Sequence, residues 1–214
     1  LSGHGYNGTY TGGVLANTHS PRNENAPTFT GAPGGLNIGA SAAFRSAFNG
    51  NEGTYFISLK AKDLAQWTNA TADYFLRIEV DTDNYIYLYR SANVNYISTS
   101  RKAAGGTAVT PYGYVYPTDW FSLIVTWSVS GGYFRLYLNG KRIAGVTDGS
   151  ITDSYTGTPG STKTRICALN ATTSTAQFWA ADAGFLTRPA TDAEALTLSK
   201  MLVPVIKTLS IFGD

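Results

Sequence analysis

The sequence predicts an all-β protein in which two antiparallel sheets pack as one sandwich over residues 1–214, with one short helix near the C-terminus. Composition is the first observation: aromatic residues make up 13% of the chain, charged residues only 14%, and there are 23 glycines. Aromatic and β-branched residues suit half-buried pleated surfaces, and glycines suit tight turns. The second observation is apolar–polar alternation in mid-chain, interrupted by Gly-rich and Asx-rich turns. A chain of this length buries a large core without disulfides.

The first elements are short strands. Residues 1–35 are rich in Gly, Asn, Thr and Pro, which predicts edge strands joined by turns. A longer strand opens at Glu52. Its expected core face carries Tyr55, Ile57 and Leu59.

Two hairpins follow. Residues 74–90 alternate on both sides of an Asx-rich turn at 81–84. In the first strand, one face holds Leu76, Ile78 and Val80, and the other holds Phe75, Arg77 and Glu79. Residues 121–138 repeat the pattern, with Phe121, Leu123, Val125 and Trp127 on the expected core face and Ser122, Ile124 and Thr126 opposite. Asn139-Gly140 then signals a type I′ turn into residues 141–144.

The C-terminal third predicts a loop at 147–163, strands at Arg165–Leu169 and Gln177–Leu186, and the helix. Thr191 is the expected N-cap and Glu194 the N3 residue of a capping box. The remaining segment, 201–214, is apolar and contains Pro204. It fits either a last strand or a tail that docks on a neighbour.

Several of these segments together carry a family resemblance. The run from Asp119 to Trp127, followed by Phe134-Arg135-Leu136-Tyr137-Leu138-Asn139-Gly140-Lys141, resembles the central hairpin of the concanavalin A-like lectin/glucanase superfamily. The opening residues 3–12 and the ending, where Phe185-Leu186-Thr187 precedes the capped helix, are similar to that family as well. The resemblance implies a laminin-G-like, jelly-roll sandwich. Ser58 and the Ala180-Ala181 pair depart from the family pattern and leave the subfamily open.

Several classes of function lack support. The net charge is only +2 and the basic residues are scattered, so no nucleic-acid footprint is present. No apolar stretch is long enough to span a bilayer. Both histidines, His4 and His19, lie in the Gly-rich opening, so no catalytic triad or zinc cluster is indicated. The single cysteine, Cys167, reads as a small buried hydrophobe.

One acidic run invites two interpretations. Laminarinase-type glycosidases of the resembled superfamily carry Glu-x-Asp-x-Glu on one strand, and Glu79, Asp81 and Asp83 approximate that spacing. Related laminin-G modules bind calcium through loop oxygens, which makes Asp81, Asp83 and Asn84 the weak calcium candidates. Asp-Thr-Asp-Asn is also ordinary turn chemistry, and we expect a hairpin turn with no cofactor or metal.

The candidate binding residues are outward-facing. If Ile86 and Leu88 point into the core, Tyr85, Tyr87 and Tyr89 point out, beside Arg77 and Glu79. A second set of the same composition is Tyr133, Arg135 and Tyr137. Tyrosines offer a flat apolar ring with a polar tip, and charged neighbours offer hydrogen-bonding arms, a mixture that suits sugars. The same pattern is typical of a subunit-facing sheet.

The sequence therefore predicts a non-catalytic carbohydrate-binding or adhesion module of a larger secreted, cell-surface or virion protein, with a glycan or polysaccharide as partner. The alternative is a structural or assembly domain, on a phage particle or cell surface, that contacts other protein subunits. A glycoside hydrolase ranks third. Fold resemblance alone does not decide among these functions.

Overall fold

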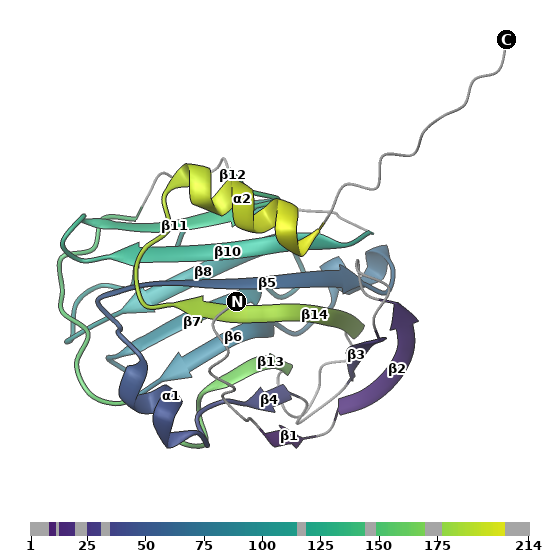
Figure 1. The fold of residues 1–214 in the computed structure, drawn as a ribbon, viewed down its shortest axis with the longest axis horizontal. Helices are drawn as coiled ribbons and strands as arrows, with labels where there is room; N and C mark the ends of the chain where they lie inside the picture. The colour runs from purple at the N-terminus through teal and green to yellow at the C-terminus, as the bar shows by residue number, and fades with distance from the viewer. Residues whose placement is uncertain are drawn as a thin grey trace, which may run out of the picture.

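The computed structural model describes residues 9–11, 13–19, 25–30, 35–114, 119–143, 149–169 and 177–203. Within them, two seven-stranded sheets lie face to face (Figure 1). Sheet A has the order β1 (Thr9–Thr11), β4 (Gly35–Asn37), β13 (Arg165–Leu169), β6 (Asp73–Glu79), β7 (Tyr85–Arg90), β8 (Tyr96–Lys102), β9 (Tyr112–Tyr114).

Sheet B has the order β12 (Lys141–Arg142), β11 (Tyr133–Leu138), β10 (Phe121–Ser128), β5 (Glu52–Ala61), β14 (Gln177–Leu186), β3 (Asn25–Thr30), β2 (Gly13–His19). Neighbouring strands pair antiparallel in both sheets. The predicted antiparallel β-sandwich is confirmed.

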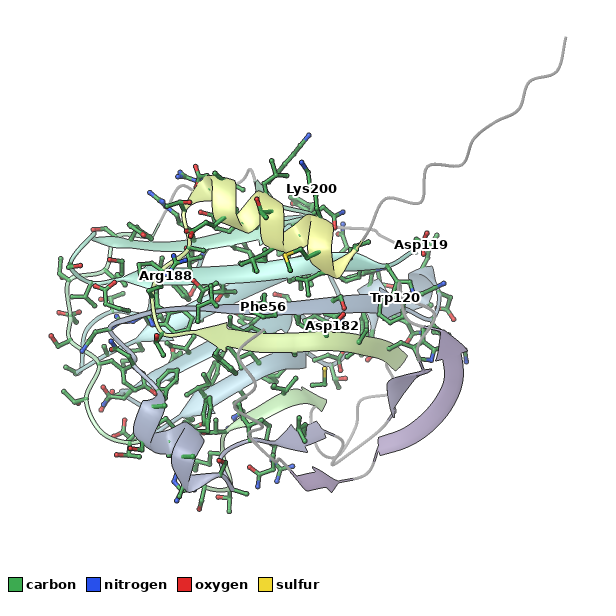
Figure 2. All side chains as sticks on the ribbon, in the orientation of Figure 1. Phe56, Asp119, Trp120, Asp182, Arg188 and Lys200 are labelled. Carbon is green, nitrogen blue, oxygen red and sulfur yellow. The ribbon has the colours of Figure 1, made fainter. Side chains whose placement is uncertain are left out.

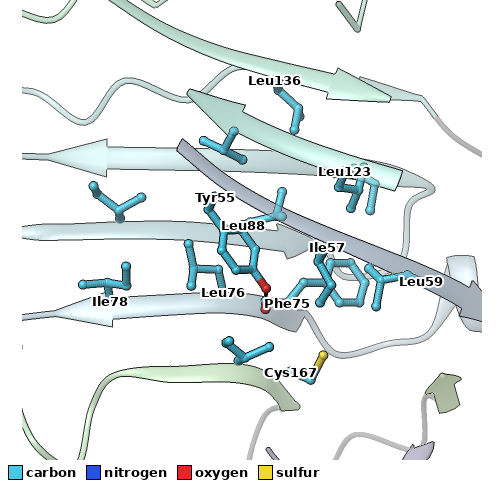
Figure 3. Packing of buried hydrophobic residues seen from close by; sticks show 14 of the residues in the cluster. Tyr55, Ile57, Leu59, Phe75, Leu76, Ile78, Leu88, Leu123, Leu136 and Cys167 are labelled. Carbon is cyan, nitrogen blue, oxygen red and sulfur yellow. Dashed lines mark hydrogen bonds between the residues drawn. The ribbon is translucent and has the colours of Figure 1, made fainter. Parts of the chain in front are cut away.

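The core lies between the sheets, where the alternation predicted it (Figure 3). Alternate residues of each strand reach it because successive side chains of a strand point to opposite faces. The buried side chains contributed by the two predicted hairpins and by β5 include Tyr55, Ile57, Leu59, Leu76, Ile78, Ile86, Leu88, Phe121, Leu123, Val125, Trp127, Phe134 and Leu136.

Phe75 breaks the alternation, and its predicted outward position is wrong. In the β6–β7 pairing, Tyr74 lies opposite Tyr89, whereas Leu76 already lies opposite Leu88. One extra residue on β6 is a β-bulge, which re-aims the side chains on one side of it. Phe75 and Leu76 consequently both enter the core, and Tyr74 remains on the outer face.

The turn after β11 follows the prediction. Asn139 and Gly140 have φ of 49° and 76°. Two consecutive positive φ values are the signature of a type I′ turn.

The structure confirms the predicted helix and adds two short helices that were not predicted. The predicted C-terminal helix exists as α2 (Asp192–Leu202), with the Thr191–Glu194 capping box formed as expected. Two short helices, α1 (Ala42–Ala47) and the 3₁₀ helix η1 (Leu64–Thr68), were not predicted. None of the helices among the described residues has the length and apolar character needed to cross a membrane.

α2 packs on the outer side of sheet B, against β10 and β12 (Figure 1). It covers a second, smaller cluster made by Phe56, Ile124, Tyr137, Ala195 and Leu202. Met201 and Leu202 belong to α2, so no strand begins at residue 201. Residues 204–214 lie outside the described part of the chain.

Candidate ligand-binding face

The predicted tyrosine row of β7 lies on the outer face of sheet A. Ile86 and Leu88 are fully buried in the core, so Tyr85, Tyr87 and Tyr89 stand on the opposite side of the strand, where each is partly exposed. The predicted orientation of this row is confirmed.

Four further tyrosines share this face, and the sequence reasoning missed them. Tyr74 pairs with Tyr89 across β6 and β7. Tyr96, Tyr112 and Tyr114 come from β8 and β9, and Tyr114 is 64% exposed. The alternation in Tyr112-Gly113-Tyr114 was the available signal, but its meaning depends on β9 being the next strand in the sheet.

The seven rings form two groups. In the group on β6 and β7, Tyr85 and Tyr87 are stacked with centroids 4.3 Å apart and planes at 10°. Tyr74 contacts Tyr87 and Tyr89 at 5.4 and 5.5 Å.

The group on β8 and β9 is built around Tyr96. Its ring lies 5.1 Å from Tyr112 and 4.4 Å from Tyr114, and the Tyr96 and Tyr114 hydroxyls are 2.6 Å apart. Alongside the β7 row, β8 places the small side chains of Ser98 opposite Tyr89 and Ser100 opposite Tyr87, and Lys102 opposite Tyr85.

Glu79 is the polar centre of the group on β6 and β7. Its Oε2 accepts from Arg77 Nε and Nη2 at 3.0 and 2.7 Å and from the Tyr87 hydroxyl at 2.8 Å. Its Oε1 accepts from Lys163 Nζ at 2.8 Å. Burial alone would raise the pKa of Glu79, but the hydrogen bonds from Lys163, Arg77 and Tyr87 outweigh it and hold that pKa at about 2. Glu79 is therefore an ionised anchor that fixes the arms around it.

Arg77 and Tyr87, which donate hydrogen bonds to Glu79, are also part of the aromatic surface. The Arg77 guanidinium lies 5.7 Å from the Tyr74 ring centroid and 5.8 Å from that of Tyr87. Burial and the hydrogen bond to Glu79 both raise the pKa of the Tyr87 hydroxyl, so it donates a proton into its hydrogen bond throughout the physiological range. The face thus combines rigid rings with oriented polar groups.

The second predicted set does not join this face. Tyr133, Arg135 and Tyr137 lie on β11 in sheet B, on the other side of the sandwich. Arg135 sits over the Tyr133 ring, 3.8 Å from its centroid. Tyr137 has no exposed surface, because α2 covers it and its hydroxyl donates to Asp192 Oδ1 at 2.7 Å. The prediction of Tyr137 as an open binding residue is wrong.

The acidic run forms a turn. β6 ends at Glu79, so the same-face geometry of a strand does not extend to Asp81 and Asp83. Asp81 Oδ1 accepts from the Asp83 amide at 2.8 Å, and Asp83 Oδ1 lies 2.5 Å from Lys102 Nζ.

The third calcium candidate, Asn84, is also engaged in hydrogen bonds within the chain. The Asn84 side-chain oxygen accepts from the amides of Ala104 and Thr156, at 3.2 and 3.0 Å, and thereby pins two loops. Among the described residues, no three His, Cys, Asp or Glu side chains gather as a metal-binding cluster.

Comparison with known proteins gives a fold and no family. No protein-family model matches the chain, and no curated protein matches it. Among solved structures, the binding domain of botulinum neurotoxin serotype G superposes with a TM-score of 0.68 at 12% identity, over 93% of this chain and 47% of that one. The receptor-binding domain of the C/D mosaic serotype gives 0.68 at 12% identity, over 92% and 47%.

A third structure is a complex with a small molecule. The ligand-binding domain of serotype D, in complex with N-acetylneuraminic acid, gives a TM-score of 0.67 at 12% identity, over 92% of this chain and 47% of that one. The chain spans about half the length of these structures. At this identity the likeness establishes the β-rich sandwich fold alone.

Proposed function

We propose that this chain is a non-catalytic carbohydrate-binding module whose binding surface is the tyrosine face of sheet A. The observation that carries the proposal is the gathering of seven tyrosines from four strands on one outer face, where an ionised carboxylate beside the β6–β7 group holds three polar arms. A purely structural strand face needs no such concentration of partly exposed rings, and large exposed aromatic patches indicate an interaction surface.

The chemistry of the face suits sugars. A pyranose presents apolar C–H groups that stack on an aromatic ring, and equatorial hydroxyls that need fixed partners. Tyr85 and Tyr87 offer a stacked platform, and Arg77 and Lys163 offer donors already oriented by Glu79. Groups that are oriented before binding lose little entropy when a ligand arrives.

The solved structures are compatible with this proposal. They are receptor-binding or ligand-binding domains, one of them in complex with N-acetylneuraminic acid. Membership in the concanavalin A-like, laminin-G-like group over residues 1–214, and a location outside the cell, on its surface or on a virion, remain part of the proposal.

A glycosidase is a poor fit for the same residues. Catalysis by a carboxylate pair needs a general acid whose pKa is raised. The hydrogen bonds to Glu79 hold its pKa at about 2, so it does not serve as the acid near neutral pH. Asp81, in the turn, accepts the Asp83 amide and the Asn84 side-chain amide through one oxygen.

A second candidate is an assembly domain. The observation that favours it is Tyr114, which is 64% exposed at β9, the last described strand of sheet A. An edge strand with exposed rings suits contact with another protein chain. Light scattering at several concentrations separates the two functions, because an assembly surface produces oligomers and a glycan-binding surface leaves the chain monomeric.

The test is a glycan array followed by calorimetry with the best hit. We expect Tyr85→Ala to weaken binding roughly three- to tenfold, because a well-placed aromatic contact contributes about 0.5–1.5 kcal/mol. Tyr85→Ala is a cleaner test than Tyr87→Ala, because Tyr87→Ala also removes a hydrogen bond to Glu79. The matched control is Tyr133→Ala, which removes a partly exposed tyrosine from the opposite sheet. Equal affinities of Tyr85→Ala and the wild type would move any glycan site away from this face.

A further inference from the structure

A cleft of about 490 Å³ opens at the end of the sandwich where β5 begins and β14 ends, at the left of Figure 1. It lies between α1 and the link from β14 to α2, and none of the seven tyrosines lines it. Ligand sites are typically 300–1,000 Å³ in volume. The cleft is lined by Phe44, Ala47, Phe48, Asn49, Glu52, Trp127, Phe185, Leu186, Thr187 and Arg188.

Four of these residues form an aromatic wall. Phe44 lies 5.1 Å from Phe185 between ring centroids, and Phe48 lies 6.1 Å from Trp127. Trp127 is fixed because its Nε1 donates to the Asn49 carbonyl at 3.0 Å. Phe44 and Trp127 are buried, so Phe48 and Phe185 are the rings that present surface to the cleft, and the two buried rings hold them in place.

Glu52 supplies the charge of the cleft. Its Oε1 accepts from the Ser130 amide at 3.1 Å, from the Ser130 hydroxyl at 2.7 Å and from the Ser128 hydroxyl at 3.2 Å. Burial opposes ionisation of Glu52, but these hydrogen bonds outweigh it and leave its pKa below the ordinary value. Within the described ranges, no Lys or Arg forms an ion pair with it.

Among the described residues that line the cleft, Arg188 is the one cation, and it is already neutralised. Arg188 donates from Nη1 and Nη2 to the two carboxylate oxygens of Glu194, at 3.0 and 2.6 Å. The three charges of Glu52, Arg188 and Glu194 sum to one negative charge, which belongs to Glu52.

We propose that this cleft binds an organic ammonium group, that is, a quaternary or protonated amine carried on a small apolar body. Aromatic rings attract such cations through their electron-rich faces, and a nearby carboxylate adds charge complementarity. The apolar body takes the place of water against Phe48 and Phe185, both of which are partly exposed. This site is independent of the glycan proposal and stands if that proposal fails.

The experiment titrates the full chain with choline chloride, and in parallel with 3,3-dimethylbutan-1-ol, the neutral molecule of nearly the same shape. Sodium chloride at equal concentration controls for ionic strength. Two-dimensional NMR follows the Trp127 indole and the amides of residues 44–52 and 185–188. We expect saturable shifts with choline at these positions, and binding of the neutral alcohol at least about tenfold weaker.

Two variants assign the charge. Glu52→Gln keeps an oxygen acceptor for the serines and removes the charge, and we expect it to weaken choline binding about tenfold without changing the affinity for the alcohol. Asp119→Asn is the matched control, since it removes a carboxylate at the opposite end of the sandwich (Figure 2). It should bind choline as the wild type does.

A third variant covers the case in which Glu52→Gln fails to fold. Ala47→Trp places a large ring at an exposed position that lines the cleft, and it should abolish the choline shifts by filling the space. Equal affinity for choline and the alcohol, the absence of shifts at the cleft, or undiminished binding in Glu52→Gln would each overturn the proposal.

Discussion

At the scale of single residues, one ion pair lies fully buried inside the sandwich. Arg90 Nε and Nη2 donate to Asp73 Oδ2 at 2.9 and 2.6 Å, and both side chains are fully buried. Arg90 also donates to the carbonyls of Asn69 and Ser91, at 3.0 and 2.6 Å. The strand alternation that sends Ile86 and Leu88 inward sends Arg90 inward too, and a buried charge requires a partner.

Removing one member of this pair leaves the other charge buried alone. We expect Asp73→Ala to lower the free energy of unfolding by about 3–5 kcal/mol, measured by urea denaturation. The double variant Asp73→Leu/Arg90→Met removes both charges and should regain part of that loss. A single variant as stable as the wild type would contradict the view that the guanidinium depends on Asp73.

Glu79 makes stability depend on pH. Its pKa of about 2 in the folded chain lies below the ordinary value of 4.5, so the unfolded chain takes up the proton first. The stabilisation is complete above about pH 4.5 and is lost as the pH falls from there toward 2. It amounts to roughly 3 kcal/mol, since the pKa falls from 4.5 to about 2 and one pKa unit corresponds to 1.36 kcal/mol.

Glu79→Gln isolates this contribution. We expect its free energy of unfolding to fall less steeply than that of the wild type between pH 4.5 and 2, because the titrating group is gone. Chemical denaturation at several pH values measures both slopes. Identical slopes would show that the network around Glu79 does not favour its ionised form.

At the scale of elements, α2 is the best-specified helix. The Thr191 hydroxyl accepts from the Glu194 amide at 3.2 Å, and Glu194 Oε2 accepts from the Thr191 amide at 2.9 Å. Such a capping box supplies partners for amides that the first turn leaves free. Its position decides which residues of sheet B are covered, including Tyr137.

Thr191→Ala removes the cap. We expect a loss of about 1 kcal/mol in the free energy of unfolding, because alanine cannot accept the Glu194 amide. Thr197→Ala is the control, since Thr197 is exposed within the same helix and alanine has the higher helix propensity. A Thr191→Ala variant as stable as that control would mean that the cap contributes nothing to the fold.

The sequence predicts those elements that have a clear local pattern and misses those that do not. Both hairpins and α2 follow from local patterns, and Ile86, Leu88 and Trp127 lie where those patterns put them. α1 has six residues, and its N-cap Ser41 has no acidic residue in the first turn to complete a recognisable signal. The inward turn of Phe75 depends on a bulge, which alternation does not reveal.

Only part of the candidate site could be predicted from the sequence, because the rest depends on how distant segments pack. Tyr85, Tyr87 and Tyr89 follow from alternation within one strand. The contribution of Tyr96 and Tyr112 requires knowledge that β8 and β9 extend sheet A beyond β7. The burial of Tyr137 results from α2, about 55 residues further along the chain. The direction of a side chain follows from its own strand, whereas its burial depends on which distant elements pack over it.

At the scale of the whole molecule, the two outer faces of the sandwich differ. Sheet B carries α2 and a small apolar cluster beneath it. Sheet A carries partly exposed tyrosines in the corresponding place. The cleft beside α1 occupies an end of the sandwich and belongs to neither face. This division separates a broad surface suited to extended ligands from a confined site suited to a small one.

The extra residue in β6 matters to the interior more than to the surface. Without Phe75, the pairs Tyr74–Tyr89 and Leu76–Leu88 would be consecutive, so Tyr74 would stay in the ring cluster and Asp73 would stay opposite Arg90. The core would instead lose a ring that packs 5.0 Å from Phe178. An in-frame loss of this codon would therefore resemble a large-to-small core replacement. Homologues can be expected to keep a large apolar side chain at position 75 wherever they keep the bulge.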